Sequence, residues 1–191
     1  MDGRVIRGEQ TRRNILARAV DIASVEGLEG LSIGRLATDL DVSKSGLFAH
    51  FGSKEELQLA TIEAAARIFY AEVIGPALVT PPSPDRVYHL LDRWLAYSRT
   101  RVFPGGCFFA RVGAEFGGRP GRIRDAIAEL DCTWLGVVAQ AIAQARMESD
   151  PDQLAFELNA YARAANAASL VHGDDNAYER ADRAVRAALG R

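Results

Sequence analysis

The stretch 32–57 (SIGRLATDLDVSKSGLFAHFGSKEEL) constrains the fold more than any other part of the sequence. It begins with apolar residues that recur at the spacing of one helix face: Ile33, Leu36, Ala37 and Leu40. Leu47 and Phe51, four residues apart, then predict a second short helix. Two short helices with a narrow apolar seam and a polar outer face are typical of a helix-turn-helix, whose second helix fits the major groove of DNA.

The residues between and after these two helices favour the same interpretation. Asp41 tolerates the left-handed backbone that a tight turn needs, and Ser43 can cap the second helix. Gly52 is expected to end that helix. Ser53 is followed by Glu56 three residues later, and this capping box predicts the start of a third helix.

The rest of the chain is also expected to be helical. Ala is abundant, β-branched runs are scarce, and Gly and Pro cluster between periodic stretches, so the predicted fold class is all-α. An arm over 1–8 precedes the first helix, and its Arg4 and Arg7 either enter the minor groove or belong to a disordered tail. We expect helices over 10–26, 53–78 (interrupted at Gly75-Pro76), 83–102 (capped by Ser83), 107–116 (buried on most sides), 122–147, 151–171 (capped by Asp150) and 176–189.

Net charge gives the DNA-binding interpretation no support, but local charge does. The chain carries a formal charge of −2, and 1–56 holds eight Lys/Arg against nine Asp/Glu. The segment 42–54, in contrast, contains two lysines and no acid. The electrostatic footprint for nucleic acid is therefore confined to the predicted second helix and its flanks.

Metal, disulfide and membrane chemistry are not indicated by the sequence. Cys107 and Cys132 form no ligand pair or disulfide framework, and three well-separated histidines suggest no metal site. We expect no cofactor. No charge-free apolar run of about 18 residues and no signal sequence is visible, so we expect a cytoplasmic protein without a membrane span.

The run 42–57 (VSKSGLFAHFGSKEEL) resembles the TetR family of transcriptional regulators. The family pattern is a valine-serine turn, a short recognition helix with a leucine-aromatic pair, a phenylalanine, and then Ser-Lys-Glu-x-Leu. Two positions depart from it: Asp41 replaces the usual Gly, and Phe48 replaces the usual Tyr, so the DNA contact of a Tyr hydroxyl is lost there. The resemblance implies a helix-turn-helix DNA-binding domain over 9–69 and an effector-binding and dimerisation domain over 70–191.

The predicted DNA-binding residues share exposure on the second helix or at its ends. Hydroxyl, amine and imidazole groups there can donate to phosphates or base edges, and Gly46 lets the backbone approach DNA. Lys54 is placed for a phosphate contact at a helix start. The alternative is a helical hairpin with a solvated polar face. The predicted set is Ser43, Lys44, Ser45, Gly46, Phe48, His50 and Lys54.

A second group of residues is predicted to bind the effector. It is mostly aromatic, as small-molecule pockets commonly are, with Tyr97, Arg111 and Glu115 as candidate polar groups. Ordinary core packing is the alternative for each residue, and for Cys107 the choice is between a reactive thiol and a buried small hydrophobe. The predicted ligand-binding set is Trp94, Tyr97, Cys107, Phe108, Phe109, Phe116 and Trp134.

The last two predicted helices are expected to form a homodimer. Each has an apolar seam with alternating spacings of three and four, which is typical of helices packed in a bundle. The seams consist of Leu154, Leu158, Tyr161, Ala165 and Ala168, and of Tyr178, Ala181, Val185 and Ala188.

Together these features predict a non-enzymatic regulator. It would bind a palindromic DNA operator as a dimer, most simply as a repressor, and a small, mostly apolar effector of unknown identity would release it. The alternative is an all-helical small-molecule carrier or enzyme without DNA binding, although no nucleophile elbow, phosphate loop or metal spacing is present.

Overall fold

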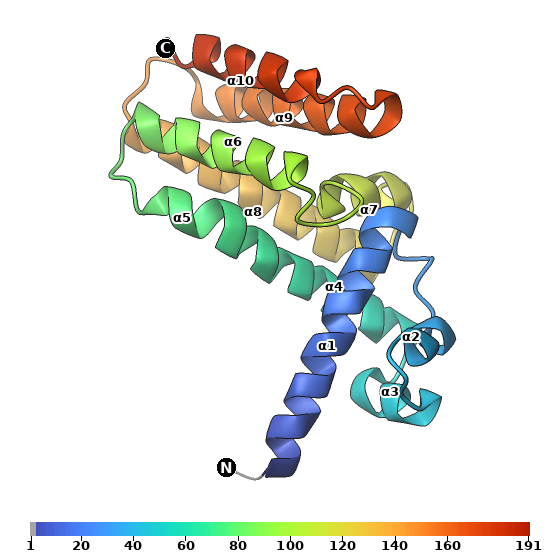
Figure 1. Ribbon diagram of the computed structural model, residues 1–191. Coiled ribbons are helices and arrows are strands. Elements are labelled where there is room, and N and C mark those ends of the chain that lie inside the picture. The colour runs from blue at the N-terminus through green and yellow to red at the C-terminus, as the bar shows by residue number, and fades with distance from the viewer. Residues whose placement is uncertain (1–2) are drawn as a thin grey trace. The chain divides into compact units, whose positions relative to one another are not determined.

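The computed structural model describes residues 3–191, and side chains from residue 8 onward. In this part of the chain all regular secondary structure is helical, which confirms the all-α prediction (Figure 1). The elements are α1 (Gly3–Glu26), α2 (Ile33–Asp39), α3 (Lys44–Phe51), α4 (Lys54–Phe69), the π-helical segment η1 (Tyr70–Ile74), α5 (Gly75–Leu78), α6 (Pro84–Arg99), α7 (Phe108–Phe116), α8 (Arg122–Gln144), α9 (Pro151–His172) and α10 (Asn176–Ala188).

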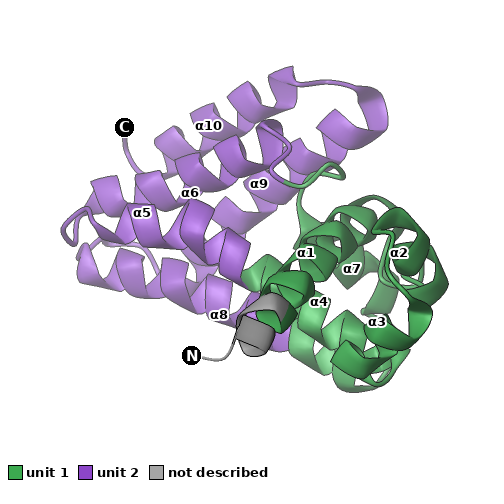
Figure 2. Ribbon diagram, turned by 60° about the horizontal axis from the view of Figure 1, so that its bottom comes forward, with its two compact units in different colours: residues 1–66, 103–127 green, residues 67–102, 128–191 purple. Residues whose placement is uncertain are grey.

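The helices form two compact units, coloured separately in Figure 2. The first comprises 1–66 and 103–127, and the second comprises 67–102 and 128–191. The helix-turn-helix head, which comprises α1, α2, α3 and the start of α4, therefore packs with α7 and the start of α8. These two segments lie far from the head in the sequence. The predicted functional domains, 9–69 and 70–191, divide the chain differently and remain a prediction.

The core of the first unit is built from leucines that the head contributes. Leu28, Leu31, Leu36, Leu47 and Leu57 have 0% of their surface exposed. Burying each such side chain stabilises the folded state by about 1.5–3 kcal/mol. They come from α2, α3, α4 and the turn before α2, so these short segments are held together mainly by packing against one another.

α7 completes this unit with one apolar face. Phe108, Val112 and Phe116 are buried at spacings of four, whereas Arg111 and Ala114 are exposed. The prediction of a helix buried on most sides therefore holds except at these two exposed positions, since the other residues of 107–116 are buried or half-buried.

The expected interruption of the long helix takes the form of a π-helical segment before Pro76. The Gly75 N–H donates to the Tyr70 carbonyl, five residues back, and the helix then continues through Pro76 as α5. Proline lacks an N–H and cannot make the usual bond to the residue four back. The wider turn of η1 shifts the hydrogen-bond register by one residue just ahead of it.

The second unit contains α6, α9 and α10, joined by a buried polar network. The Ser98 hydroxyl donates to Asn166 Oδ1 at 2.8 Å and lies 2.9 Å from the Tyr178 hydroxyl. Arg101, whose φ is 56°, donates to Ser169 Oγ at 2.7 Å. These bonds link all three helices, so they fix one arrangement of an otherwise alanine-rich interface.

A second polar contact joins α6 to α10. The Tyr88 hydroxyl donates to Asp182 Oδ1 at 2.9 Å, and the Arg186 guanidinium lies over the Tyr88 ring, 4.4 Å from its centroid. Burial of the phenol and its hydrogen bond to the Asp182 carboxylate raise the pKa of Tyr88 to about 12.

The predicted helix starts are mostly confirmed. Ser32, Ser53 and Asp150 each accept a hydrogen bond from the N–H three residues on, at 3.1, 3.1 and 2.8 Å. α6 begins at Pro84 as predicted, but the prediction that the Ser83 side chain caps it is wrong. The Ser83 hydroxyl donates instead to the Pro81 carbonyl at 3.0 Å.

The predicted N-terminal arm over 1–8 is also wrong where the structure describes it. α1 already begins at Gly3 and continues without a break to Glu26. The glycines at 3 and 8 therefore do not stop the helix. Residues 1–2 and the side chains of Arg4 and Arg7 lie outside the described part, so a minor-groove role for them stays a prediction.

One described helix, α8, is long and apolar enough to cross a membrane by length and composition alone. It contains Glu129 and Asp131, so it is not a charge-free apolar run of 18 residues. Core helices of water-soluble bundles meet the same test, so this feature is weak support for a membrane span.

Gly105 is expected to be essential for closing the first unit. A Cβ built on it would lie 1.9 Å from the Ser24 carbonyl oxygen, whereas none of the described atoms lies within 4 Å of one built on Gly118. We expect Gly105→Ala to lower the free energy of unfolding by about 2 kcal/mol or more, because the backbone at Gly105 and the backbone at Ser24 would have to separate to make room for the methyl group. Denaturant unfolding measures this, with Gly118→Ala as the control that leaves stability nearly unchanged.

Candidate DNA-binding site and effector region

The turn between α2 and α3 has the geometry that the sequence predicts. Asp41 adopts φ 53°, a left-handed conformation that Asp tolerates better than most residues. Ser43 then caps α3, since its hydroxyl accepts from the Gly46 N–H at 3.1 Å. Gly52, at φ 73°, ends the helix. A tight left-handed turn and a side-chain cap thus fix where α3 begins and which way it points.

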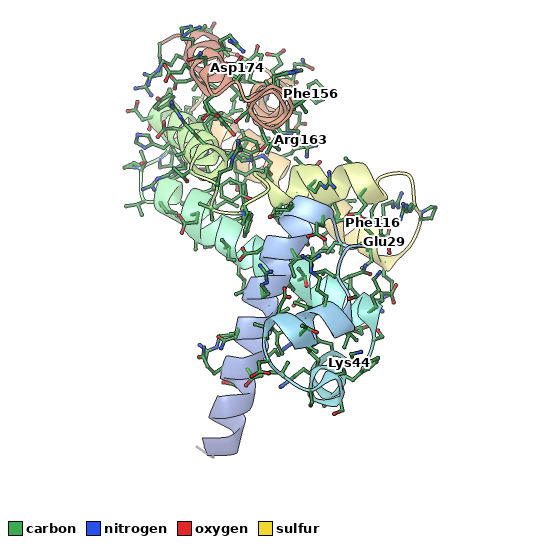
Figure 3. All side chains as sticks on the ribbon, turned by 45° about the vertical axis from the view of Figure 1, so that its right-hand side comes forward. Glu29, Lys44, Phe116, Phe156, Arg163 and Asp174 are labelled. Carbon is green, nitrogen blue, oxygen red and sulfur yellow. The ribbon has the colours of Figure 1, made fainter. Side chains whose placement is uncertain are left out.

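α3 buries one edge and exposes the other. Leu47 and Phe51 are 0% and 6% exposed, whereas Phe48 is 51% exposed. Lys44 and Ser45 in its first turn are also exposed, and His50 is half-buried. Figure 3 labels Lys44 at this helix. The exposed edge therefore combines one amine, hydroxyls and an aromatic ring, a set suited to phosphate, base-edge and thymine-methyl contacts.

Phe51 has a partner that sequence reasoning missed. The Arg12 guanidinium of α1 lies over its ring, with the central carbon 4.8 Å from the ring centroid. Its Nη1 is buried with no hydrogen-bond partner among the described residues. The spacing from Arg12 to Phe51 carries no local signal, so only the tertiary structure reveals this cation–π contact between α1 and α3.

Lys54 is already engaged by the head itself. Its Nζ donates to the Glu29 carbonyl at 3.0 Å and lies 2.9 Å from the Glu29 carboxylate. The hydrogen bond and the charge of Lys54 lower the pKa of Glu29. A phosphate that bound Lys54 would share the amine with Glu29 or replace it. The phosphate contact of Lys54 therefore remains a prediction, and in it the phosphate would compete with Glu29 for the amine.

The predicted effector residues fall into two aromatic clusters. In the second unit the Phe69 ring meets Tyr97 and Trp134 edge-on, at centroid distances of 5.3 and 5.2 Å, and Trp94 lies 6.4 Å from Tyr97. All are buried. The Trp134 indole N–H donates to Asn159 Oδ1 at 3.1 Å.

The other cluster belongs to the first unit. Phe108 lies 5.8 Å from Phe103 and 5.3 Å from Phe109 between ring centroids. Phe116 packs under the Arg119 guanidinium at 5.4 Å. Cys107 is buried at the N-cap of α7, which favours its interpretation as a small hydrophobe, whereas Cys132 is exposed.

Two of the candidate polar groups are not positioned as pocket residues. Arg111 is exposed on α7. Glu115 turns toward the head, where its carboxylate accepts from the Leu28 and Glu29 N–H groups at 2.8 and 2.9 Å. These bonds cross more than 80 residues of sequence and had no local signal.

Comparison with known families identifies the fold. Residues 15–61 match the family model described as bacterial regulatory proteins, tetR family. Residues 83–185, more than half of the chain, match the model described as tetracyclin repressor-like, C-terminal domain. The chain belongs to the TetR family. It is therefore a transcriptional regulator with a DNA-binding helix-turn-helix and a ligand-binding C-terminal domain.

Solved TetR-family structures share the fold over nearly the whole chain. A regulator from Streptomyces coelicolor is 23% identical, with a TM-score of 0.83 over 95% of each chain. One from Chloroflexus aurantiacus is 22% identical, with a TM-score of 0.86 over 97% of this chain and 96% of that one. AibR, solved with isovaleryl coenzyme A and operator DNA, is 19% identical, with a TM-score of 0.74 over 92% and 96%. A search of curated proteins found no match.

The cap on α3 gives a direct test of how the site is built. We expect Ser43→Ala to lower the free energy of unfolding by about 1 kcal/mol, because the Gly46 N–H loses its acceptor. Ser45→Ala is the matched control, since the Ser45 hydroxyl bonds only the Ser43 hydroxyl among the described contacts, at 3.3 Å. Equal unfolding midpoints for the two variants would contradict the cap.

Proposed function

We propose that this TetR-family regulator is a cytoplasmic, dimeric repressor that binds a palindromic operator and is released by a small, mostly apolar effector. The observation that carries the proposal is the two-sided character of α3. Leu47 and Phe51 anchor it in the head, and its first turn leaves Lys44, Ser45 and the Phe48 ring open to a partner. A short, rigidly capped helix with such an outer edge fits a major groove.

Phe48 gives this edge an unusual character. It is half exposed and has no hydroxyl, so it can make apolar contact with a thymine methyl or with sugar but cannot donate to phosphate. The remaining donors of the predicted DNA-binding set are Ser43, Lys44, Ser45, His50 and Lys54. We infer that Lys44 supplies the main charged contact, because Lys54 is shared with Glu29.

The aromatic cluster around Phe69 supports an apolar effector. Trp94, Tyr97 and Trp134 present large apolar faces and a few polar atoms, the composition of a typical small-molecule site. AibR binds isovaleryl coenzyme A and operator DNA, so a chain of this fold accommodates both kinds of ligand. If the two ligands favour different conformations, each must weaken the other's binding by the same factor.

Support for dimerisation through α9 and α10 has to come from residues of these helices that one folded chain leaves uncovered. Six seam residues are already buried within the chain: Leu154, Leu158, Ala165, Tyr178, Ala181 and Val185. The predicted seam is thus largely an internal contact between α9 and its neighbours, because periodicity indicates an apolar face and not what covers it.

A groove lined by the same two helices, to which the seam residues Tyr161, Ala165, Ala168 and Ala181 contribute, is better suited to a second chain. It has a volume of about 260 Å³ and is lined largely by alanine from α9 and α10, including Ala164, Ala168 and Ala184. Phe156, labelled in Figure 3, is 64% exposed on α9, and Val171 is 74% exposed. Small residues allow close helix approach, and a two-fold axis would make the surface self-complementary.

The operator interaction is tested on Lys44. A duplex is first selected from a random-sequence pool by the wild-type chain, and footprinting should show a two-fold symmetric protected site. We then expect Lys44→Ala to weaken binding several-fold and to lower the slope of log K against log salt by about two, because each of the two heads of the dimer loses one phosphate contact. Arg99→Ala, which removes an exposed cation from α6, should change neither.

The dimer is tested by charge within the groove. We expect Ala168→Glu to convert the dimer to monomer in sedimentation experiments, since a buried, unpaired carboxylate is costly. Ala96→Glu makes the same change on an exposed residue of α6, outside this groove, and should leave the association state unchanged. A wild-type chain that sediments as a monomer at micromolar concentration would rule the dimer out.

A further inference from the structure

The turn that leads into the helix-turn-helix buries Gly27, Leu28 and Leu31 but exposes Glu29, and it is held from two sides. Leu28 and Leu31 have no exposed surface, so the peptide groups beside them need partners inside the protein. α2 begins at Ile33, directly after this turn. The conformation of the turn therefore sets how α2, and with it α3, leaves α1.

The N–H side of the turn is held by a carboxylate from α7. Glu115 Oε2 accepts from the Leu28 N–H at 2.8 Å, and Oε1 accepts from the Glu29 N–H at 2.9 Å. Gly27 precedes them in a left-handed conformation, φ 85°, which aims successive N–H groups at one point. A Cβ on Gly27 would lie 2.3 Å from Glu115 Oε2, so the carboxylate sits directly against the backbone.

The carbonyl side of the same turn is held by α4. The buried Gln58 amide donates to the Leu28 carbonyl at 2.9 Å, and Lys54 donates to the Glu29 carbonyl at 3.0 Å. Glu29 also faces Arg119, which follows α7, at 3.5 Å, and Figure 3 labels Glu29. Two peptide units are thus clamped between α4 and α7.

A neighbouring contact ties the loop before α7 to α1. The Gly105 N–H donates to the Ser24 hydroxyl at 3.0 Å, one turn before Gly27. Arg122 also pairs with Glu55 and Glu56 in the first turn of α4, at 2.9 and 2.6 Å, although exposed pairs of this kind stabilise little. Among the residues that 103–127 contributes to these contacts, Glu115 is the one that accepts from the backbone N–H groups of the turn before α2.

We propose that Glu115 is a positioning residue for DNA recognition, acting through the Leu28–Glu29 turn to hold α2 and α3 in the orientation that binds DNA. The proposal rests on the proposed DNA-binding function. A carboxylate is required because both partners are N–H donors. An amide in its place would present one acceptor and one donor, and the donor would face an N–H.

The test uses the full chain and the duplex selected by the wild-type protein. We expect Glu115→Gln to bind that duplex roughly tenfold more weakly, within the range usual for coupling between distant sites. The Leu28 and Glu29 amides should exchange with solvent faster, because their acceptor is impaired. Val112→Ala, which removes buried volume from α7 but keeps the carboxylate, controls for lost stability.

Each outcome is decisive. Positioning is supported if Glu115→Gln loses affinity for the duplex while Val112→Ala, with an equal loss in free energy of unfolding, keeps it. If the two variants lose affinity equally at equal stability, or if Glu115→Gln keeps full affinity, the proposal is overturned while the proposed function stands. A wild-type chain that selects no duplex overturns both.

A second variant covers the case in which Glu115→Gln does not fold. Glu115→Asp keeps the charge but withdraws the carboxylate by one methylene from the turn. We expect an intermediate loss of affinity and faster exchange at the same two amides. Unchanged affinity together with faster exchange at these amides would show that the turn moves without affecting recognition, and would overturn the proposal.

Discussion

Buried peptide groups must find hydrogen-bond partners, and this requirement organises the first unit of the protein. The turn after α1 places Leu28 and Leu31 in the core while Glu29 stays exposed, and the Leu28 and Glu29 N–H groups face α7. Glu115 of α7 meets both. The head, with α1, α2, α3 and the start of α4, therefore shares its core and its hydrogen bonds with 103–127.

Because of this sharing, the two compact units of the chain differ from a division into a DNA-binding part and an effector-binding part. The segment that follows α6 contributes the aromatic cluster of Phe103, Phe108 and Phe109, yet it belongs to the same compact unit as the recognition helix. The buried rings around Phe69 belong to the other unit. A functional boundary drawn between a DNA-binding part and an effector-binding part thus does not follow the packing.

Local rules carried much of the prediction. The left-handed Asp41, the caps at Ser32, Ser43 and Ser53, and the burial of Leu47 and Phe51 depend on residues within about four positions of one another, which sequence periodicity reports directly. The errors lie where a second constraint intervenes. The expected arm before residue 8 is helical from Gly3 onward, and the Ser83 hydroxyl bonds backward to the Pro81 carbonyl instead of capping α6.

By itself the sequence determined an all-helical chain with a helix-turn-helix whose outer edge carries Lys44, Ser45 and Phe48, because helix faces, turns and caps are short-range properties. Only the tertiary structure decided what covers each apolar face. It placed Glu115 against the Leu28–Glu29 turn, Arg12 over Phe51, and most of the α9 and α10 seams inside one chain. Those contacts join residues tens of positions apart, and no periodic pattern specifies the partner of a buried face.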